Sequence, residues 1–195
     1  ERPSANVFGT VMHRAFELLI TRYEYLMSLE LSEREKEVQG SIYQAILEQE
    51  EELRASDSPE DFATYLKKIL GTYLETVIKP IMDSAEEVYP EYSFSFYVSK
   101  EEREGFLDTF ATYFKEAKEP IEIGGQEILV NGQADLVVKH KDGTIKVYDY
   151  KSDSRNGKAL KEFEESLEKK YKGQLALYQY AIGKAFGVEK VDTEL

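Results

Sequence analysis

The chain has 195 residues, of which 42% are hydrophobic, which is enough for one domain with a buried core. It has no cysteine and only two histidines, His13 and His140, which excludes disulfides, thiolate zinc sites and cysteine-ligated iron–sulfur clusters. The net charge is −13, which argues against a nucleic-acid binder that acts alone, because neutralising phosphates needs a basic surface.

The first part of the chain has apolar residues at helical spacing. This spacing predicts helices over residues 8–23, about 33–54 and 59–78. Pro59 follows Ser58, a sequence typical of the start of a helix. Pro80 is expected to interrupt or kink the third helix, and Tyr89-Pro90 is expected to close the helical part.

The second part alternates between β-prone and helical patterns. Helices are predicted over residues 101–118 and from 157 to about 186, with a break near Lys172-Gly173 left open. Gly124-Gly125 predicts a turn, and residues 141–144 predict a tight hairpin turn. The predicted strands are residues 92–98, 128–131, 133–139 and 145–150.

These elements predict an α/β fold with a small mixed sheet flanked by helices and an added helical region. We expect residues 1–195 to form a single domain. Within it, about 30–90 form the helical elaboration, and about 91–187 form the sheet core with the C-terminal helices.

Charge is distributed unevenly along the chain. Acids gather at residues 48–52 and 101–104, and basic residues gather in one late segment. Solvated helix faces explain both runs as well as a binding surface does, so the charge pattern leaves both interpretations open. The basic residues are Lys151, Arg155, Lys158, Lys161, Lys169, Lys170 and Lys172.

The predicted hairpin carries the residues with the clearest chemistry. Asp135 lies in its first strand, and Asp149 and Lys151 lie two residues apart at the end of its second strand. Pairing of the strands can bring the two aspartates together, where a divalent cation such as Mg²⁺ or Mn²⁺ removes their repulsion. An Asp-x-Lys sequence is common, however, and alone it fits an ordinary surface hairpin.

Two further pairs share a helix face at i,i+4 spacing. His13 and Glu17 lie on the first helix, one turn after Gly9, and Gln174 and Tyr178 lie on the last. Taken alone, a histidine such as His13 is more often a core residue than a metal ligand, and the second pair alone indicates only a helix with a polar seam.

Four motifs in this order resemble the RecB-type nuclease family, a branch of the PD-(D/E)XK superfamily. The resemblance runs from Gly9 to Tyr178, nearly the whole chain. The motifs are Gly9-x-x-x-His13-x-x-x-Glu17, Gly132-x-x-Asp135, Asp149-Tyr150-Lys151-Ser152 and Gln174-x-x-x-Tyr178.

The resemblance implies a restriction-endonuclease-like core and a role for each matching residue. His13, Asp135, Asp149 and the Tyr150 backbone carbonyl would hold Mg²⁺ or Mn²⁺, and Lys151 would act with Asp135 and Asp149 in catalysis. The remaining roles are as follows: Gln174 and Tyr178 would position the substrate, Glu17 would support the site from behind, and Glu91 is the one weak candidate for a further acid that the family often carries.

The absence of cysteine separates this chain from the cluster-bearing members of the family. It therefore most resembles the C-terminal nuclease domain of AddA/RecB-like helicase–nucleases, which implies a metal-dependent deoxyribonuclease without an iron–sulfur cluster. Exonuclease action on single-stranded DNA is favoured, in double-strand-break repair and recombination, with a helicase domain in the same or a partner chain. The alternatives are a catalytically silent module that guides DNA or docks a partner protein, and a stand-alone exonuclease.

No apolar run is long enough to cross a membrane, so we expect no membrane partner and a cytoplasmic location. The chain begins at Glu1 rather than Met. We therefore expect it to be a piece of a longer protein.

Overall fold

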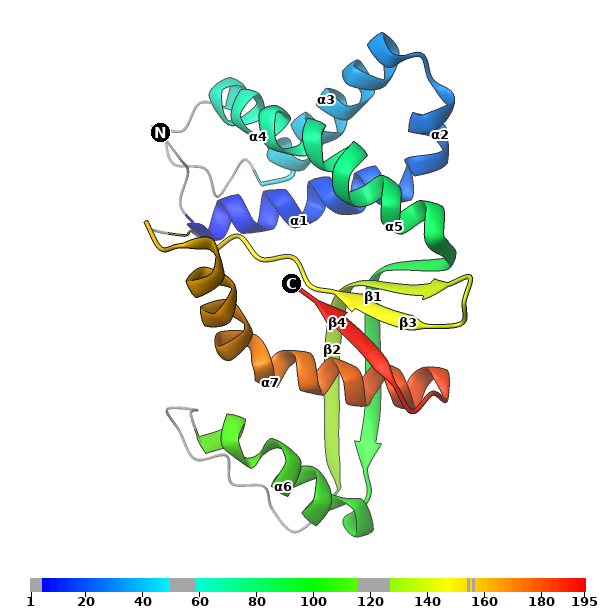
Figure 1. The fold of residues 1–195 in the computed structure, drawn as a ribbon, viewed down its shortest axis with the longest axis vertical. Helices are drawn as coiled ribbons and strands as arrows, with labels where there is room; N and C mark the ends of the chain where they lie inside the picture. Colours follow the sequence, from blue (N-terminus) through cyan, green and yellow to red (C-terminus); the bar gives the residue numbers. More distant parts are fainter. Residues whose placement is uncertain (1–4, 50–58, 116–126, 154, 156) are drawn as a thin grey trace. The chain divides into compact units, whose positions relative to one another are not determined.

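The computed structural model describes residues 5–49, 59–115, 127–153, 155 and 157–195 (Figure 1). The chain divides into two compact units. Unit 1 comprises Glu1–Pro90, Val138–Lys141 and Tyr150–Ser154, and unit 2 comprises Glu91–Val137, Asp142–Asp149 and Arg155–Leu195. The expectation of a single domain over residues 1–195 stays a prediction.

Unit 1 is built mainly from helices. Helix α3 packs against α1, α2 and α4, so that apolar residues from four helices share one core. The spacing of those apolar residues predicts helices in this part of the chain, and the helices are confirmed. Part of the range expected for the second predicted helix, residues 50–54, lies outside the described residues. The helices are α1 (Ala5–Thr21), α2 (Tyr23–Ser28), α3 (Leu31–Leu47), α4 (Pro59–Tyr73), the π-helix η2 (Leu74–Ile78) and α5 (Lys79–Ser84).

Pro80 widens the helix rather than ending it. A proline has no N–H to donate, and its ring clashes with the carbonyl four residues earlier, which here belongs to Thr76. The helix accommodates Pro80 by forming the π-helix η2 over Leu74–Ile78, and α5 continues with Pro80 in its first turn.

Arg34 closes the C-terminal end of α2. Its Nε donates to Leu26 O at 3.0 Å, and its Nη2 donates to Met27 O at 3.5 Å and Leu29 O at 3.2 Å. Its Nη1 forms an ion pair with Glu75 at 3.0 Å. The guanidinium thus satisfies carbonyls that a helix end leaves without intrahelical donors.

The sheet has four strands in the order β1-β2-β3-β4. Strands β3 and β4 are parallel, with Ile145 opposite Val191 and Tyr148 opposite Glu194, whereas β2 and β3 form the predicted hairpin, so the sheet is mixed. The strands are β1 (Ala85–Val98), β2 (Ile128–His140), β3 (Ile145–Tyr148) and β4 (Val191–Glu194).

Three strand predictions were wrong in detail. Strand β1 begins at Ala85 and runs through Pro90, which an edge strand tolerates because one side of it has no ladder to break. Strand β2 continues through Gly132 instead of dividing there, and β3 ends at Tyr148, two residues before the predicted end. Strand β4 was missed because four residues carry too short a pattern to detect.

The hairpin turn is confirmed. Gly143 has a φ of 85°, which favours glycine. Asp142 Oδ1 accepts hydrogen bonds from the Thr144 N–H at 2.9 Å and from the Thr144 hydroxyl at 2.7 Å. These bonds close the turn locally and so set the register that pairs β2 with β3.

Two helices complete unit 2, α6 (Lys100–Lys115) and α7 (Leu160–Phe186). Helix α7 is continuous through Lys172-Gly173, so no break occurs there, although the helix bends along its length (Figure 1). Helix α6 packs against α7, and α7 packs against β4. Val98, Phe106 and Phe110 form one centre of this core. The predicted Gly124-Gly125 turn lies outside the described residues.

None of the described helices combines the length and the apolar character needed to cross a bilayer.

Candidate active site

The charges of three carboxylates in unit 2 raise the pKa of one buried hydroxyl group, that of Tyr178. Burial raises the pKa of Tyr178, and the negative charges of Asp149, Asp135 and Glu91 raise it further, to about 12. The Asp149 side chain is only 2% exposed, and its backbone N–H donates to Glu194 O on β4 at 2.9 Å. Asp135 and Asp149 thus both act on the pKa of the Tyr178 hydroxyl, and their joint binding of a cation stays a prediction.

Glu91 lies beside Asp135, with a carboxylate oxygen of each within 4.8 Å of the other. Its backbone has a φ of 49°, in the left-handed region that few residues with a side chain adopt. Gln133 Nε2 donates to the Glu91 carbonyl at 3.2 Å. A costly backbone conformation is typical of functional positions, so Glu91 is a stronger candidate than its place beside the predicted strand suggested.

The Gln-x-x-x-Tyr motif forms a chain of hydrogen bonds from α7 to β2. Gln174 Nε2 donates to the Tyr178 hydroxyl at 2.7 Å, and this hydroxyl donates to Gln133 O at 3.0 Å. Tyr178 is 5% exposed. This series of hydrogen bonds ends at Gln133, two residues before Asp135, and the substrate-positioning role of Gln174 and Tyr178 stays a prediction.

Gly132 is required for packing against Phe94. A Cβ at this position would overlap the Phe94 ring. The same ring packs edge-to-face against Tyr178, with centroids 6.2 Å apart. The glycine that opens the Gly-x-x-Asp motif thus lets an aromatic side chain support the wall of the site.

In unit 1, the first-helix motif meets the segment that follows β3. His13 Nε2 lies 2.8 Å from Tyr150 O, and the two rings pack edge-to-face at 5.7 Å. A Cβ on Gly9 would lie 3.2 Å from Ser152 Oγ, so the helix approaches the Asp-Tyr-Lys-Ser segment closely. This meeting explains a glycine in the middle of a helix, where it otherwise costs about 1 kcal/mol.

Lys151 and Glu17 are the two remaining predicted site residues. Lys151 is half-buried and follows Tyr150 directly. Glu17 accepts a hydrogen bond from Arg14 at 2.7 Å, and Arg14 also pairs with Glu48 at 2.6 Å. The structure thus shows Glu17 paired with Arg14, and its support of the site stays a prediction.

The donor set fits a hard divalent cation. Unit 1 holds an imidazole nitrogen and a backbone carbonyl, and unit 2 holds carboxylates, with no sulfur among the donors. Neighbouring ligands of an octahedral ion at about 2.1 Å lie about 3 Å apart. The 2.8 Å between His13 Nε2 and Tyr150 O is close to that separation.

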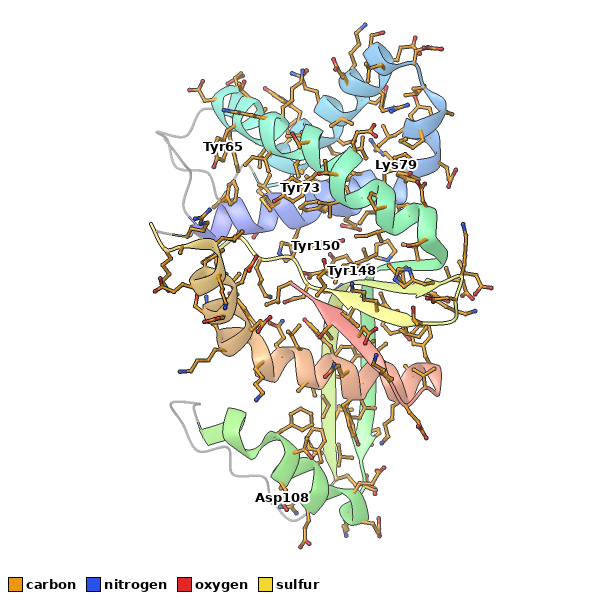
Figure 2. All side chains as sticks on the ribbon, viewed as in Figure 1. Tyr65, Tyr73, Lys79, Asp108, Tyr148 and Tyr150 are labelled. Atoms are coloured by element: carbon orange, nitrogen blue, oxygen red, sulfur yellow. The ribbon has the colours of Figure 1, made fainter. Side chains whose placement is uncertain are left out.

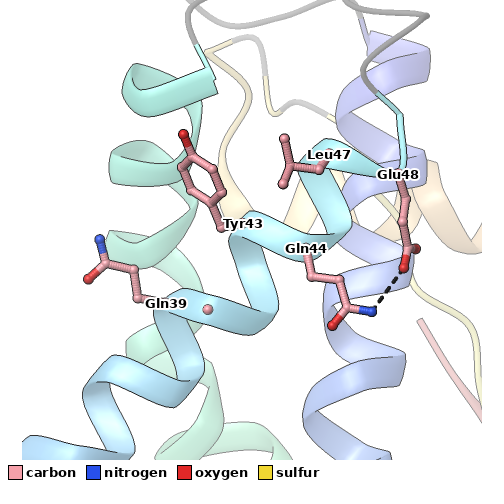
Figure 3. A pocket seen from close by; sticks show the side chains of 6 residues that line it. Gln39, Tyr43, Gln44, Leu47 and Glu48 are labelled. Carbon is pink, nitrogen blue, oxygen red and sulfur yellow. Dashed lines mark hydrogen bonds between the residues drawn. The ribbon is translucent and has the colours of Figure 1, made fainter.

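An open hollow of about 670 Å³ lies on α3 (Figure 3), and the residues that line it are distant in sequence from the candidate metal ligands. Its lining is mainly apolar and includes Tyr43 and Leu47, with Gln44 bonded to Glu48 at 3.0 Å. It contains none of the predicted site residues, so its size alone gives it no catalytic role.

A family model for the PD-(D/E)XK nuclease superfamily matches residues 1–193, whereas a search of curated proteins finds none that matches. Members of this superfamily are nucleases that use divalent metal ions, so the match implies a metal-dependent nuclease that binds DNA. Because the match covers nearly the whole chain, the chain belongs to the PD-(D/E)XK nuclease superfamily.

Proposed function

We propose that this chain is a Mg²⁺- or Mn²⁺-dependent deoxyribonuclease. The observation that carries the proposal is the pair Asp135 and Glu91, whose carboxylate oxygens lie within 4.8 Å of each other, together with Asp149, which raises the pKa of the same Tyr178 hydroxyl. Such a cluster of acids is costly unless a cation offsets the repulsion. Asp135 and Asp149 are the carboxylate ligands, and Glu91 is a further acid of the same site.

His13 and the Tyr150 carbonyl complete the ligand set. Tyr150 follows Asp149 directly in the chain, and His13 Nε2 lies 2.8 Å from its carbonyl oxygen. Because the four motifs are spread over both units, we propose that residues 1–195 act as one nuclease domain.

A cation held by these residues would polarise the phosphoryl oxygen and lower the pKa of the attacking water. Lys151 supplies a positive charge that stabilises the scissile phosphate as negative charge develops on it. Tyr178 keeps its proton at neutral pH, because its pKa is raised to about 12. It therefore donates a hydrogen bond to Gln133 O of β2 and accepts one from Gln174 Nε2, and it does not act as a base.

We further propose that the domain works as the nuclease module of a helicase–nuclease, as an exonuclease on single-stranded DNA, in double-strand-break repair and recombination. The net charge of −13 supports this, because a chain so acidic gains from a motor domain that binds the DNA backbone. The absence of cysteine is consistent with AddA/RecB-like members, which need no iron–sulfur cluster.

Lys151→Ala tests the catalytic assignment. We expect Mg²⁺-dependent digestion of labelled single-stranded DNA to fall at least about 100-fold, with the melting temperature nearly unchanged. Lys161→Ala is the matched control, because Lys161 is a largely exposed lysine of the same basic segment and should keep full activity. Wild-type cleavage by the Lys151 variant would show that this lysine is not catalytic.

The metal ligands are tested separately by thermal shift. Binding to the folded state stabilises it by about 2.7 kcal/mol at a ligand concentration of about 100 times Kd. Mn²⁺ should therefore raise the melting temperature of the wild type and leave that of Asp149→Asn unchanged. An equal shift in both proteins would remove Asp149 from the ligand set.

A further inference from the structure

We propose that Tyr65 and Tyr73 form a stacking track for the bases of a single-stranded nucleic acid on α4. The proposal rests on the proposed nuclease function and adds a substrate-binding surface in unit 1. Tyr65 is 44% exposed and Tyr73 is 41% exposed. They lie eight residues apart on one flank of the helix, which corresponds to about 12 Å along its axis.

Each ring is held from behind by a buried phenylalanine of α1. The Tyr65 ring lies 5.9 Å from that of Phe8, and the Tyr73 ring lies 5.9 Å from that of Phe16. Phe8 and Phe16 belong to the core. The exposed rings are therefore fixed before a ligand arrives, which lowers the entropy cost of stacking a base on them.

The track continues into the segment that carries the candidate active site. Phe16, which contacts Tyr73, also stacks on Tyr150 with centroids 4.8 Å apart and an interplanar angle of 29°. The carbonyl of Tyr150 is the one that lies 2.8 Å from His13 Nε2. Figure 2 shows Tyr65, Tyr73 and Tyr150 in succession across unit 1. A strand on the tyrosines would thus lead toward the proposed metal ligands.

Charge is balanced on this flank of α4. Ile69, between the two tyrosines, is uncharged, and Asp61 and Lys68, each about one turn from Tyr65, carry opposite charges. Two acids of the same continuous helix turn toward α3, where Glu60 accepts from the Tyr43 hydroxyl at 3.1 Å and Glu75 pairs with Arg34.

In a chain with a net charge of −13, a flank whose acid and base offset each other repels phosphates less than the acidic runs do. Stacking also requires accessible base faces, and these are a property of single strands. These two facts favour a single-stranded nucleic acid over a duplex as the occupant of the track.

The test measures the binding of fluorescein-labelled dT15 by fluorescence anisotropy, in buffer that contains Ca²⁺ in place of Mg²⁺. The length of the strand is checked after each titration to show that it was not cleaved. Tyr65→Ala and Tyr73→Ala should each raise Kd about fivefold to tenfold, and the double variant about 50-fold, because the rings stack on different bases. Tyr65→Phe and Tyr73→Phe should bind within about twofold of wild type, since stacking needs the ring and not the hydroxyl.

Two controls isolate the contribution of the bases. Tyr25→Ala changes a tyrosine of α2 that is 51% exposed, and it should leave Kd unchanged. An abasic strand of equal length should bind the wild type and the double alanine variant with equal Kd. Unchanged dT15 binding by the double variant would overturn the proposal, as would an equal loss for dT15 and the abasic strand.

Failure of the track can be distinguished from failure of the nuclease assignment. Hydrolysis of bis(p-nitrophenyl) phosphate reports the chemistry without any base. If the wild type fails to hydrolyse this ester, the nuclease assignment is wrong. If it hydrolyses the ester while the tyrosine variants bind dT15 like wild type, only the track is wrong.

Discussion

Tyr178→Phe probes the acid cluster through its effect on stability. The substitution removes a hydroxyl that accepts from Gln174 at 2.7 Å and donates to Gln133 O at 3.0 Å. Hydrogen bonds of this kind contribute about 0.5–1.5 kcal/mol each, net of solvation. We therefore expect the free energy of unfolding to fall by about 1–2 kcal/mol near neutral pH.

The difference should disappear in alkali. The pKa of Tyr178 is raised from an ordinary 10 to about 12, first by burial and then by Asp149, Asp135 and Glu91. Because the folded state favours the neutral hydroxyl, this stabilisation is complete below pH 10 and is lost as pH rises toward 12. A shift of two units corresponds to about 3 kcal/mol in total, and about 1.4 kcal/mol is lost by about pH 11.

Urea unfolding of both proteins, followed by circular dichroism from about pH 8 to about pH 11, measures this difference. The wild type should lose its advantage by about pH 11, because phenylalanine does not titrate. Other tyrosines and lysines also titrate in this range, and comparison of the two proteins cancels their contribution. A difference in unfolding free energy that stays constant over the whole range would refute the claim that burial and the three carboxylates raise the pKa of this hydroxyl.

Two further predictions concern packing and helix ends. Gly132→Ala should lower the free energy of unfolding by about 1–3 kcal/mol, because the new Cβ overlaps the Phe94 ring. Gly105→Ala, which has open space around its Cβ, should raise the free energy of unfolding by roughly 1 kcal/mol. Similar urea midpoints for the two variants would contradict the overlap. Arg34→Ala should cost about 2–4 kcal/mol by removing its bonds to the carbonyls of α2, and Glu75→Ala less than about 1 kcal/mol; equal losses in urea denaturation would mean that the ion pair is the part that matters.

Local spacing explains which parts of the site could be predicted. A helix places residues four apart on one face, so Gln174 and Tyr178 had to be neighbours, and their 2.7 Å hydrogen bond follows. A tight turn at Gly143 likewise pairs the strands that carry Asp135 and Asp149. In these cases the geometry depends on a few consecutive residues, and sequence alone specifies it.

Other features depend on contacts between distant residues, which no local period encodes. His13 meets the Tyr150 carbonyl across 137 residues, and the sequence suggested this only through resemblance. The left-handed backbone of Glu91 and the parallel pairing of β4 with β3 left no signal in the sequence. A strained residue or a four-residue strand persists only because the surrounding packing and hydrogen bonds hold it. The sequence therefore determined the elements and the identity of most chemical groups, whereas tertiary packing decided which of those groups meet.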